Sequence, residues 1–230
     1  AYLGARWDTF ENLNGNGESY VKIDNQFGPR LGFSWDVFGD STFKVFGNAG
    51  RYYIPVYANT NVRLAGSELD TRTYWTFTGI DPVTGAPTLG QQIGGLQVTS
   101  DGSVPDPRGV VDNNLSPMYQ DEYILGMQMQ LTDLWSMGVR GIYRDLKSGM
   151  DDVCPYVQPY EWALANGYTD SQADAIGSAV NHCFLTNPGK TLSANVDLDG
   201  TGELTRVDIP ASALGLPEAK RRYNALEIFF

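Results

Sequence analysis

The segment 195–203 carries side-chain oxygens at alternate positions ahead of a glycine. It reads NVDLDGTGE, and this spacing resembles the first half of a calcium-binding EF-hand loop, where hard oxygen ligands surround a turn that glycine makes easily. The glutamate expected at the twelfth position is Arg206 instead, so only a nonstandard calcium site fits. Its candidate ligands are Asn195, Asp197, Asp199, Glu203 and Asp208. An Asx-turn, in which such side chains bond to nearby backbone, explains the cluster without a metal.

Two cysteines, Cys154 and Cys183, are separated by about 28 residues. An oxidising compartment favours a disulfide between them, and closing a loop of that length contributes roughly 3–4 kcal/mol in the chain-entropy model. Two free thiols in a cytosolic protein are the alternative. We predict the disulfide, because both cysteines fall in one long segment that we expect to be external.

Catalytic chemistry has little support in this sequence. His182 is the only histidine and adjoins Cys183, whereas a Cys-His nucleophile needs two residues that converge from separate parts of the chain. The sequence contains no Gly-rich phosphate loop, CxxC pair or HExxH motif. We therefore expect no catalytic residue, no cofactor apart from the calcium considered above, and no enzyme. His182 is expected at the surface near a helix C-terminus, where positive charge is mildly favoured.

The charge of the chain excludes one class of partner and is unevenly distributed. The net charge is −11 and the sequence pI is about 4.4, which argues against nucleic-acid binding through a basic patch. Residues 54–117 hold 6 acidic and 3 basic residues, and residues 151–216 hold 9 and 2. These two segments contribute −3 and −7, so the rest of the chain is nearly neutral. No run of 18 apolar residues occurs, which excludes a spanning helix.

Six segments alternate apolar and polar residues with the period of two that is typical of β-strands. The clearest, 119–131, reads YQDEYILGMQMQL, with apolar side chains at alternate positions from Tyr123 to Leu131 and Gly126, Gln128 and Gln130 among the residues on the other face. The expected strands are 1–10, 27–38, 42–53, 119–131, 135–146 and 222–230. Because the outermost two also read as strand, we expect the chain to be a piece of a larger protein.

The connections between these strands are strongly asymmetric. Gly39-Asp40 and Thr132-Asp133 make tight turns, whereas the other connections are the long segments 11–26, 54–117 and 151–216. Short turns at one end and long loops at the other are the layout of an outer-membrane barrel. The sequence therefore predicts an all-β fold: a segment of about six strands from a transmembrane antiparallel β-barrel, with residues 1–230 in a single barrel domain.

The long loops differ in their expected structure. Residues 11–26 contain a cluster of turn formers between Asn12 and Gly17, so we expect a loop there. Residues 54–117 show turn signals but no convincing helix, so we expect them to be irregular. In the third loop, residues 159–166 predict a short helix closed by Gly167. Thr169, with Gln172 three residues later, predicts a capping box at the start of a second helix that runs to about His182.

Alternation assigns a face to each strand residue. The apolar side chains are expected to face lipid, and the charged ones on the other face to line a polar lumen or a substrate path; they are Arg6, Asp8, Arg30, Asp36, Lys44, Glu122, Arg140, Arg144 and Glu227. Most strand aromatics are expected in interfacial girdles. Ligand stacking is open only to loop aromatics such as Tyr74, Trp75 and Trp162.

Four stretches resemble TonB-dependent outer-membrane receptors, in particular the Oar-like branch with very large barrels. They are GPRLGFSWDVFGD (28–40), KVFGNAGRYY (44–53), DEYILGMQMQL (121–131) and AKRRYNALEIFF (219–230). The resemblance implies a barrel of about 22 strands and a plug domain, neither of which is contained in this stretch. It also implies an energy-coupling partner, the TonB complex, contacted through an N-terminal region.

Two functions follow as expectations. The first is a receptor or transporter of the bacterial cell outer membrane, in contact with outer-membrane lipid and lipopolysaccharide, that takes up a ligand which the sequence does not identify. The second is a structural or adhesion protein that displays large acidic loops. A soluble carbohydrate-binding sandwich is a third reading, which detergent-free solubility of the intact protein would favour.

Overall fold

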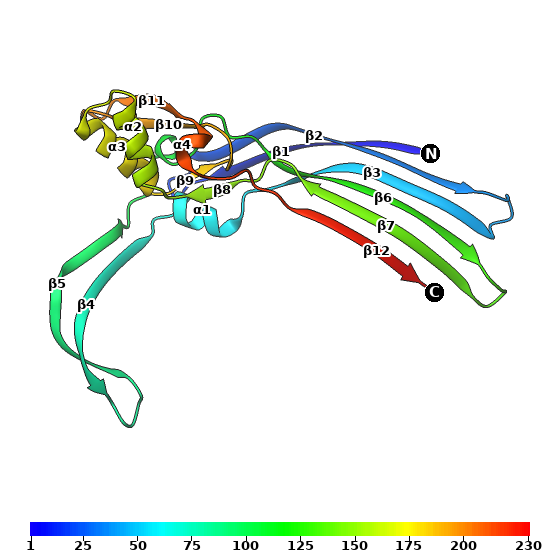
Figure 1. Ribbon diagram of the computed structural model, residues 1–230, viewed down its shortest axis with the longest axis horizontal. Coiled ribbons are helices and arrows are strands. Elements are labelled where there is room, and N and C mark those ends of the chain that lie inside the picture. Colours follow the sequence, from blue (N-terminus) through cyan, green and yellow to red (C-terminus); the bar gives the residue numbers. More distant parts are fainter.

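The chain, described over residues 1–230 by a computed structural model, consists mostly of antiparallel strands. Six of them form one sheet (Figure 1), in the order β1-β2-β3-β6-β7-β12. The bounds are β1 Tyr2–Leu13, β2 Ser19–Asp36, β3 Phe43–Ile54, β6 Met118–Gln130, β7 Ser136–Leu146 and β12 Arg222–Phe229. These are the six strands expected from alternation. The sheet is open, because β1 and β12 lie at its edges without pairing to each other.

The two short turns lie together at one end of the sheet, as expected. In the first, the Asp36 carboxylate accepts hydrogen bonds from the backbone N–H groups of Gly39 (3.0 Å) and Ser41 (2.8 Å). Gly39 has φ +76°, a left-handed conformation that glycine adopts without strain. The turns touch through the backbone N–H of Gln130, which donates to the carbonyl of Thr42 (2.7 Å).

Several glycines of the sheet are covered by an aromatic ring from a neighbouring strand. A Cβ at Gly126 would lie 2.6 Å from the Phe46 ring, and a Cβ at Gly47 would lie 2.5 Å from the Phe33 ring. Gly138 lies in the same way under Phe229. These rings fill the space that the glycines leave, an arrangement known to stabilise strand pairs.

Two of the three loop expectations are wrong. Residues 11–26 are mostly strand, because β1 and β2 continue past the sheet and pair up to Leu13 and Ser19. Residues 54–117 are not irregular: they contain α1 (Ala58–Ala65), the hairpin of β4 (Leu69–Ile80) and β5 (Pro87–Asp101), and a 3₁₀ turn at Pro107–Gly109. Pairing satisfies the backbone groups that an irregular segment of this length would leave without partners.

The third loop carries the expected helices and further strands. Its elements are β8 (Asp151–Val153), α2 (Val157–Ala165), α3 (Asp170–Asn181), β9 (Phe184–Thr186), β10 (Leu192–Asp197), β11 (Leu204–Ile209) and α4 (Ala211–Leu214). The capping box is present, since Thr169 and Gln172 each bond to the other's backbone N–H. Gly167, with φ +86°, follows α2.

Residues 147–221, together with α1 and residues 102–117, form a compact cap on the loop end of the sheet (Figure 1). One core of the cap lies between α2, α3, α4 and the β10–β11 hairpin, where Ile176, Phe184 and Leu192 are fully buried. A second core joins the cap to β2 and β6 through Val21, Met118 and other residues. The β4–β5 hairpin projects away from both cap and sheet.

Buried polar side chains join the two long loops. Asp112 accepts hydrogen bonds from the Thr186 hydroxyl (2.7 Å) and the backbone N–H of Ser193 (3.2 Å). Asn187 donates to the carbonyls of Ser116 (3.0 Å) and Gly149 (2.8 Å). Because a buried polar group without partners is costly, these bonds fix how the loops fit together.

The predicted disulfide is present. Cys154 and Cys183 are bonded with an S–S distance of 2.08 Å, and the bond closes the segment that contains α2 and α3. It therefore fastens this helical hairpin at its base, between β8 and β9.

We expect loss of this bond to weaken the cap and not the sheet. Cys154→Ser with Cys183→Ser should lower the free energy of unfolding of the cap by roughly 3–4 kcal/mol. Hydrogen exchange of α2 and α3 amides measures the effect, with β6 and β7 amides as the internal control. Equal acceleration in both regions would contradict a local role. Full thiol labelling of both cysteines in unreduced, denatured protein would rule out the bond.

Candidate functional site: two exposed faces and a folded cap

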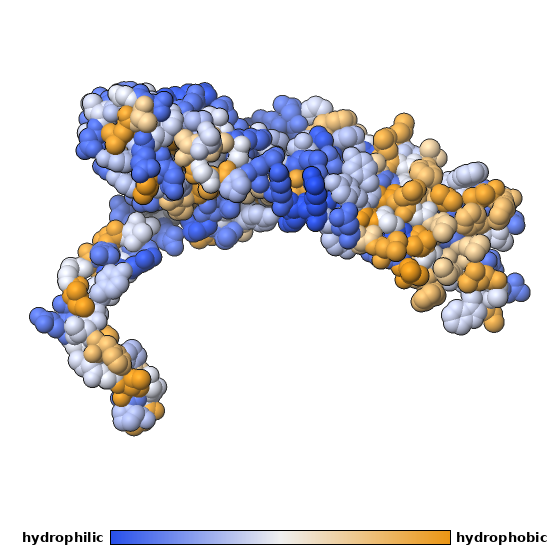
Figure 2. Space-filling model, in the orientation of Figure 1, coloured by the Kyte–Doolittle hydropathy of each residue, from blue (hydrophilic) through white to orange (hydrophobic).

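One face of the sheet is apolar across all six strands. Register aligns apolar residues in rows, such as Trp35, Val45, Met127, Val139 and Ile228. Leu31, Leu125 and Leu226 on this face are 53%, 63% and 71% exposed. We call it the outward face; Figure 2 shows it as an orange area on the part of the sheet far from the cap. No other layer of the chain covers it.

A row of charged residues borders the apolar rows on the side of the cap. Arg51, Asp121, Asp145 and Arg222 are in register on the outward face, and Lys147 follows two residues after Asp145. We call these five residues the ionic border. Arg51 bonds to Asp121 (2.9 Å), and Asp145 accepts from Lys147 (2.5 Å) and Arg222 (3.4 Å).

Aromatic rings lie beside the ionic border. Trp7 and Phe27 have ring centroids 5.7 Å apart, and Tyr53 and Tyr119 are 5.5 Å apart. The Arg51 guanidinium lies 4.0 Å from the centre of the Tyr119 ring, a cation–π contact. Amphipathic rings next to an apolar belt are typical of a membrane interface.

The opposite face is polar, and most of its charges are paired. Arg6 bonds to Asp8 (2.7 Å), and Arg140 to Glu227 (2.6 Å). Arg144 pairs with Glu122, and the Arg30 guanidinium lies 4.7 Å from the centre of the Tyr52 ring. The expected inward charges therefore lie on this face. Asp36 differs from the others, because its carboxylate accepts backbone hydrogen bonds within the first turn.

The five candidate calcium ligands do not converge. The Asp197 carboxylate accepts hydrogen bonds from the backbone N–H groups of Gly202 (2.8 Å), Gly200 (2.9 Å) and Thr201 (3.2 Å). Asp199 accepts from the Thr201 hydroxyl (2.7 Å). These bonds are those of the Asx-turn alternative, placed here at the tip of the β10–β11 hairpin.

Of the other three candidate ligands, Glu203 is exposed at the tip of the same hairpin, and the other two have partners of their own. Asn195 bonds to the Asn113 side chain (2.9 Å), and Asp208 accepts from Arg206 (3.1 Å). Three metal-ligating side chains do come together elsewhere, Asp152, Cys154 and Cys183. The disulfide removes two of them as thiolate ligands. Calcium binding at 195–208 stays a prediction.

The remaining residues of interest lie in the loops. His182 is exposed at the C-terminal cap of α3, as expected. Trp162 packs against the cap core beside Tyr168, whereas Tyr74 and Trp75 on the β4–β5 hairpin are 49% and 42% exposed.

A cavity of about 500 Å³ opens at the base of the β4–β5 hairpin, lined by Glu68, Asp101, Asp106 and His182 among others. Reasoning from the sequence missed it because its residues come from segments more than 100 positions apart.

Comparisons with known proteins place few limits on this chain. No protein family and no curated protein matches it. One solved structure with a similar chain course is the siderophore receptor PirA from Acinetobacter baumannii, at 14% identity and a TM-score of 0.35. The match covers 89% of this chain and 20% of that receptor. No helix here has the length and apolar character needed to cross a membrane.

The Asp197 turn leads to a prediction about acid and metal removal. Its hydrogen bonds, that from Gly202 foremost, hold the pKa of Asp197 below its usual value. The stabilisation they give is therefore present above pH ~4 and is lost as the pH falls through the lowered pKa. Asp197→Ala should speed proteolysis of the 195–208 hairpin at pH 7, and a chelator should leave the wild-type rate unchanged. Chelator-induced cleavage, reproduced by Asp199→Ala, would instead establish calcium.

Proposed function

We propose that this chain is part of a TonB-dependent receptor-transporter of the bacterial outer membrane, not an enzyme. In this proposal the open six-stranded sheet is a segment of a closed transmembrane barrel. The observation that carries it is the outward face: a continuous apolar surface that no second sheet or helix covers. Water would make such a surface unfavourable at about 25 cal/mol per Å², whereas lipid is its natural surroundings.

The dimensions and borders of the sheet support a membrane location. From Tyr123 to Leu131 the apolar positions extend about 27 Å along the strand at ~3.4 Å per residue. At a strand tilt of roughly 35–45°, this length spans about 20 Å of membrane depth, comparable with the apolar band of about 25 Å between the aromatic girdles of outer-membrane barrels. Short turns at one end and a folded cap at the other match periplasmic and external ends. The paired charges of the polar face would line the lumen or contact a plug.

The loops support a receptor that binds at its external end. The cavity at the base of the β4–β5 hairpin is open to the outside, and its carboxylates and hydroxyls can hydrogen-bond a polar ligand. Tyr74 and Trp75 can stack against one. Energy coupling through the TonB complex is proposed from the sequence resemblance alone. An adhesion protein that displays acidic loops is the second candidate, favoured by the net charge of −7 across residues 151–216.

A pair of adjacent substitutions tests the membrane location. Met127 lies on the outward face and Gln128 on the polar face, at the same depth. Met127→Arg should destabilise the inserted protein by roughly 2–4 kcal/mol near the midplane, whereas Gln128→Arg should cost much less. Urea unfolding in phospholipid vesicles measures both. Equal effects of the two arginines would contradict a lipid-facing surface.

A binding experiment separates the transporter from the adhesion protein. The full-length protein should be retained by the immobilised periplasmic domain of the TonB energy-coupling protein. Deletion of its N-terminal region should abolish retention while leaving the barrel inserted. An inserted barrel that the coupling domain does not retain, with or without that region, would favour the adhesion reading.

A further inference from the structure

We propose that the outward face carries a binding site for an anionic lipid, with its phosphate at the ionic border and an acyl chain in the apolar hollow beside Gly141. The inference rests on the proposed membrane location and adds a specific site to it. Three features support it: the charge of the border, the exposure of its basic side chains, and the shape of the surface next to it.

The ionic border is positive in a chain that is otherwise acidic. Arg51, Lys147 and Arg222 outnumber Asp121 and Asp145, and Lys220 lies two residues before Arg222. Three basic and two acidic residues give the border a net charge of +1, in a chain whose net charge is −11, and Lys220 itself pairs with Glu218 (3.9 Å). Positive charge is thus concentrated where the strands leave the apolar rows, the level at which lipid phosphates lie in a membrane.

Exposure within the border favours an anionic ligand. The side chains of Asp121 and Asp145 are only 14% and 11% exposed, whereas those of Arg51, Lys147 and Arg222 are 34%, 44% and 66% exposed. The carboxylates lie beneath and orient the cations. An approaching ligand therefore meets ammonium and guanidinium groups, which bind phosphate through charge-assisted hydrogen bonds.

The surface next to the border is an apolar hollow of about 950 Å³. Its lining includes two adjacent rows of the outward face, one with Tyr123 and Tyr143 and the next with Leu125, Gly141 and Leu226. A Cβ at Gly141 would meet nothing closer than 3.9 Å, so the floor there is open. Phe33, by contrast, covers Gly47 at the other side of the same row.

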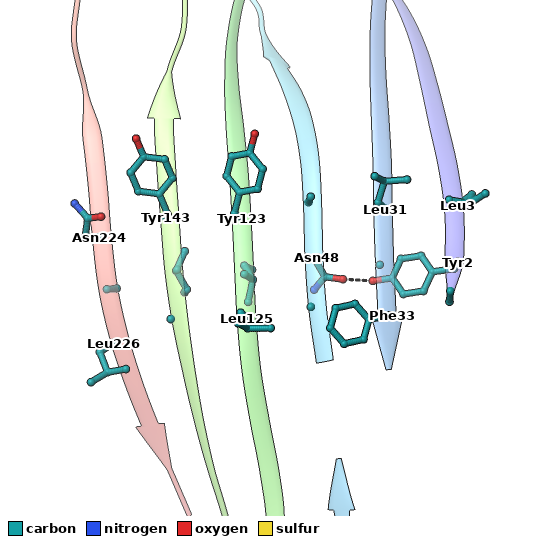
Figure 3. A pocket seen from close by; sticks show the side chains of 18 residues that line it. Tyr2, Leu3, Leu31, Phe33, Asn48, Tyr123, Leu125, Tyr143, Asn224 and Leu226 are labelled. Atoms are coloured by element: carbon teal, nitrogen blue, oxygen red, sulfur yellow. Dashed lines mark hydrogen bonds between the residues drawn. The ribbon is translucent and has the colours of Figure 1, made fainter. Parts of the chain in front are cut away.

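Two tyrosines connect the hollow to the border. The Tyr123 and Tyr143 rings lie 6.2 Å apart, and Figure 3 shows both hydroxyls pointing along the strands toward the loop end of the sheet. Asp121 and Asp145 are two residues further along, about 7 Å. A lipid laid along the strands would meet cations, then phenol hydroxyls, then apolar surface, which is the order of polarity in a phosphate-bearing lipid.

The same features disfavour a second copy of the chain as occupant. Two copies that met through this face would bring two positive borders together, and like charges at an interface oppose association. A lipid phosphate has the opposite sign. It would compensate the +1 of the border and cover Gly141 at the same time.

The test uses the full-length protein, purified in non-ionic detergent and titrated with lipid A, phosphatidylglycerol or phosphatidylcholine under native mass spectrometry. We expect one molecule of lipid A or phosphatidylglycerol to be retained in preference to phosphatidylcholine. Lys147→Gln with Arg222→Gln should weaken retention roughly 30-fold, from about fivefold per basic group at a membrane surface. Lys44→Gln with Arg140→Gln, which removes two cations from the polar face, should not.

A second variant tests the site independently, in case the charge variant misfolds. Gly141→Leu keeps every charge and adds side-chain volume where there is space, and it should reduce lipid retention by filling the hollow. Equal retention of anionic lipid and phosphatidylcholine by a correctly inserted wild-type barrel would overturn the inference and leave the proposed function intact. Displacement of the lipid by millimolar inorganic phosphate, or a dimer that Gly141→Leu disrupts, would also overturn it. Failure to insert at all would contradict the proposed function itself.

Discussion

The structure depends on a single-layer sheet whose two faces meet different surroundings. Successive side chains of a strand point to opposite faces, so a slip of one residue would move every apolar side chain to the polar face. Register is therefore fixed along all five strand pairings, and rows such as Phe33, Gly47, Leu125, Gly141 and Leu226 stay apolar across the sheet. A sheet of this kind has no interior of its own. Its apolar face becomes stable only through what lies outside the chain.

The cap differs from the sheet, because it buries apolar cores of its own. The largest fully buried side chains of the protein, such as Phe184, Ile176 and Leu192, lie there and not in the sheet. The cap is small and rich in polar residues, so it buries little apolar surface on folding. Its stability therefore also depends on a covalent bond and on buried hydrogen bonds. The Cys154–Cys183 bond and the buried Asp112 and Asn187 supply them. Sheet and cap are thus stabilised by different interactions within one chain.

Local patterns in the sequence were enough to predict the strands, the capping box at Thr169 and the disulfide, because each depends on neighbouring residues or on the only two cysteines. The β4–β5 hairpin was missed. Its register shifts at several points, including Arg72 to Tyr74, and these bulges break the period of two by which strands are recognised. The ionic border was missed as a unit for another reason. Arg51, Asp121 and Arg222 are far apart in sequence, and only strand pairing shows that they form one row.

The position of the ionic border is explained by the negative charges on either side of it. Residues 151–216 carry −7, and the lipid phosphates proposed to surround the sheet are also negative. Exposed charges are screened beyond a Debye length of about 8 Å at physiological ionic strength, so an acidic cap and an anionic lipid surface repel mainly where they come close. The ionic border lies at that junction, with its carboxylates covered and its cations exposed. In the proposed membrane barrel, a border of net positive charge between two negative layers would let a strongly acidic cap lie at the rim without being repelled from the membrane surface.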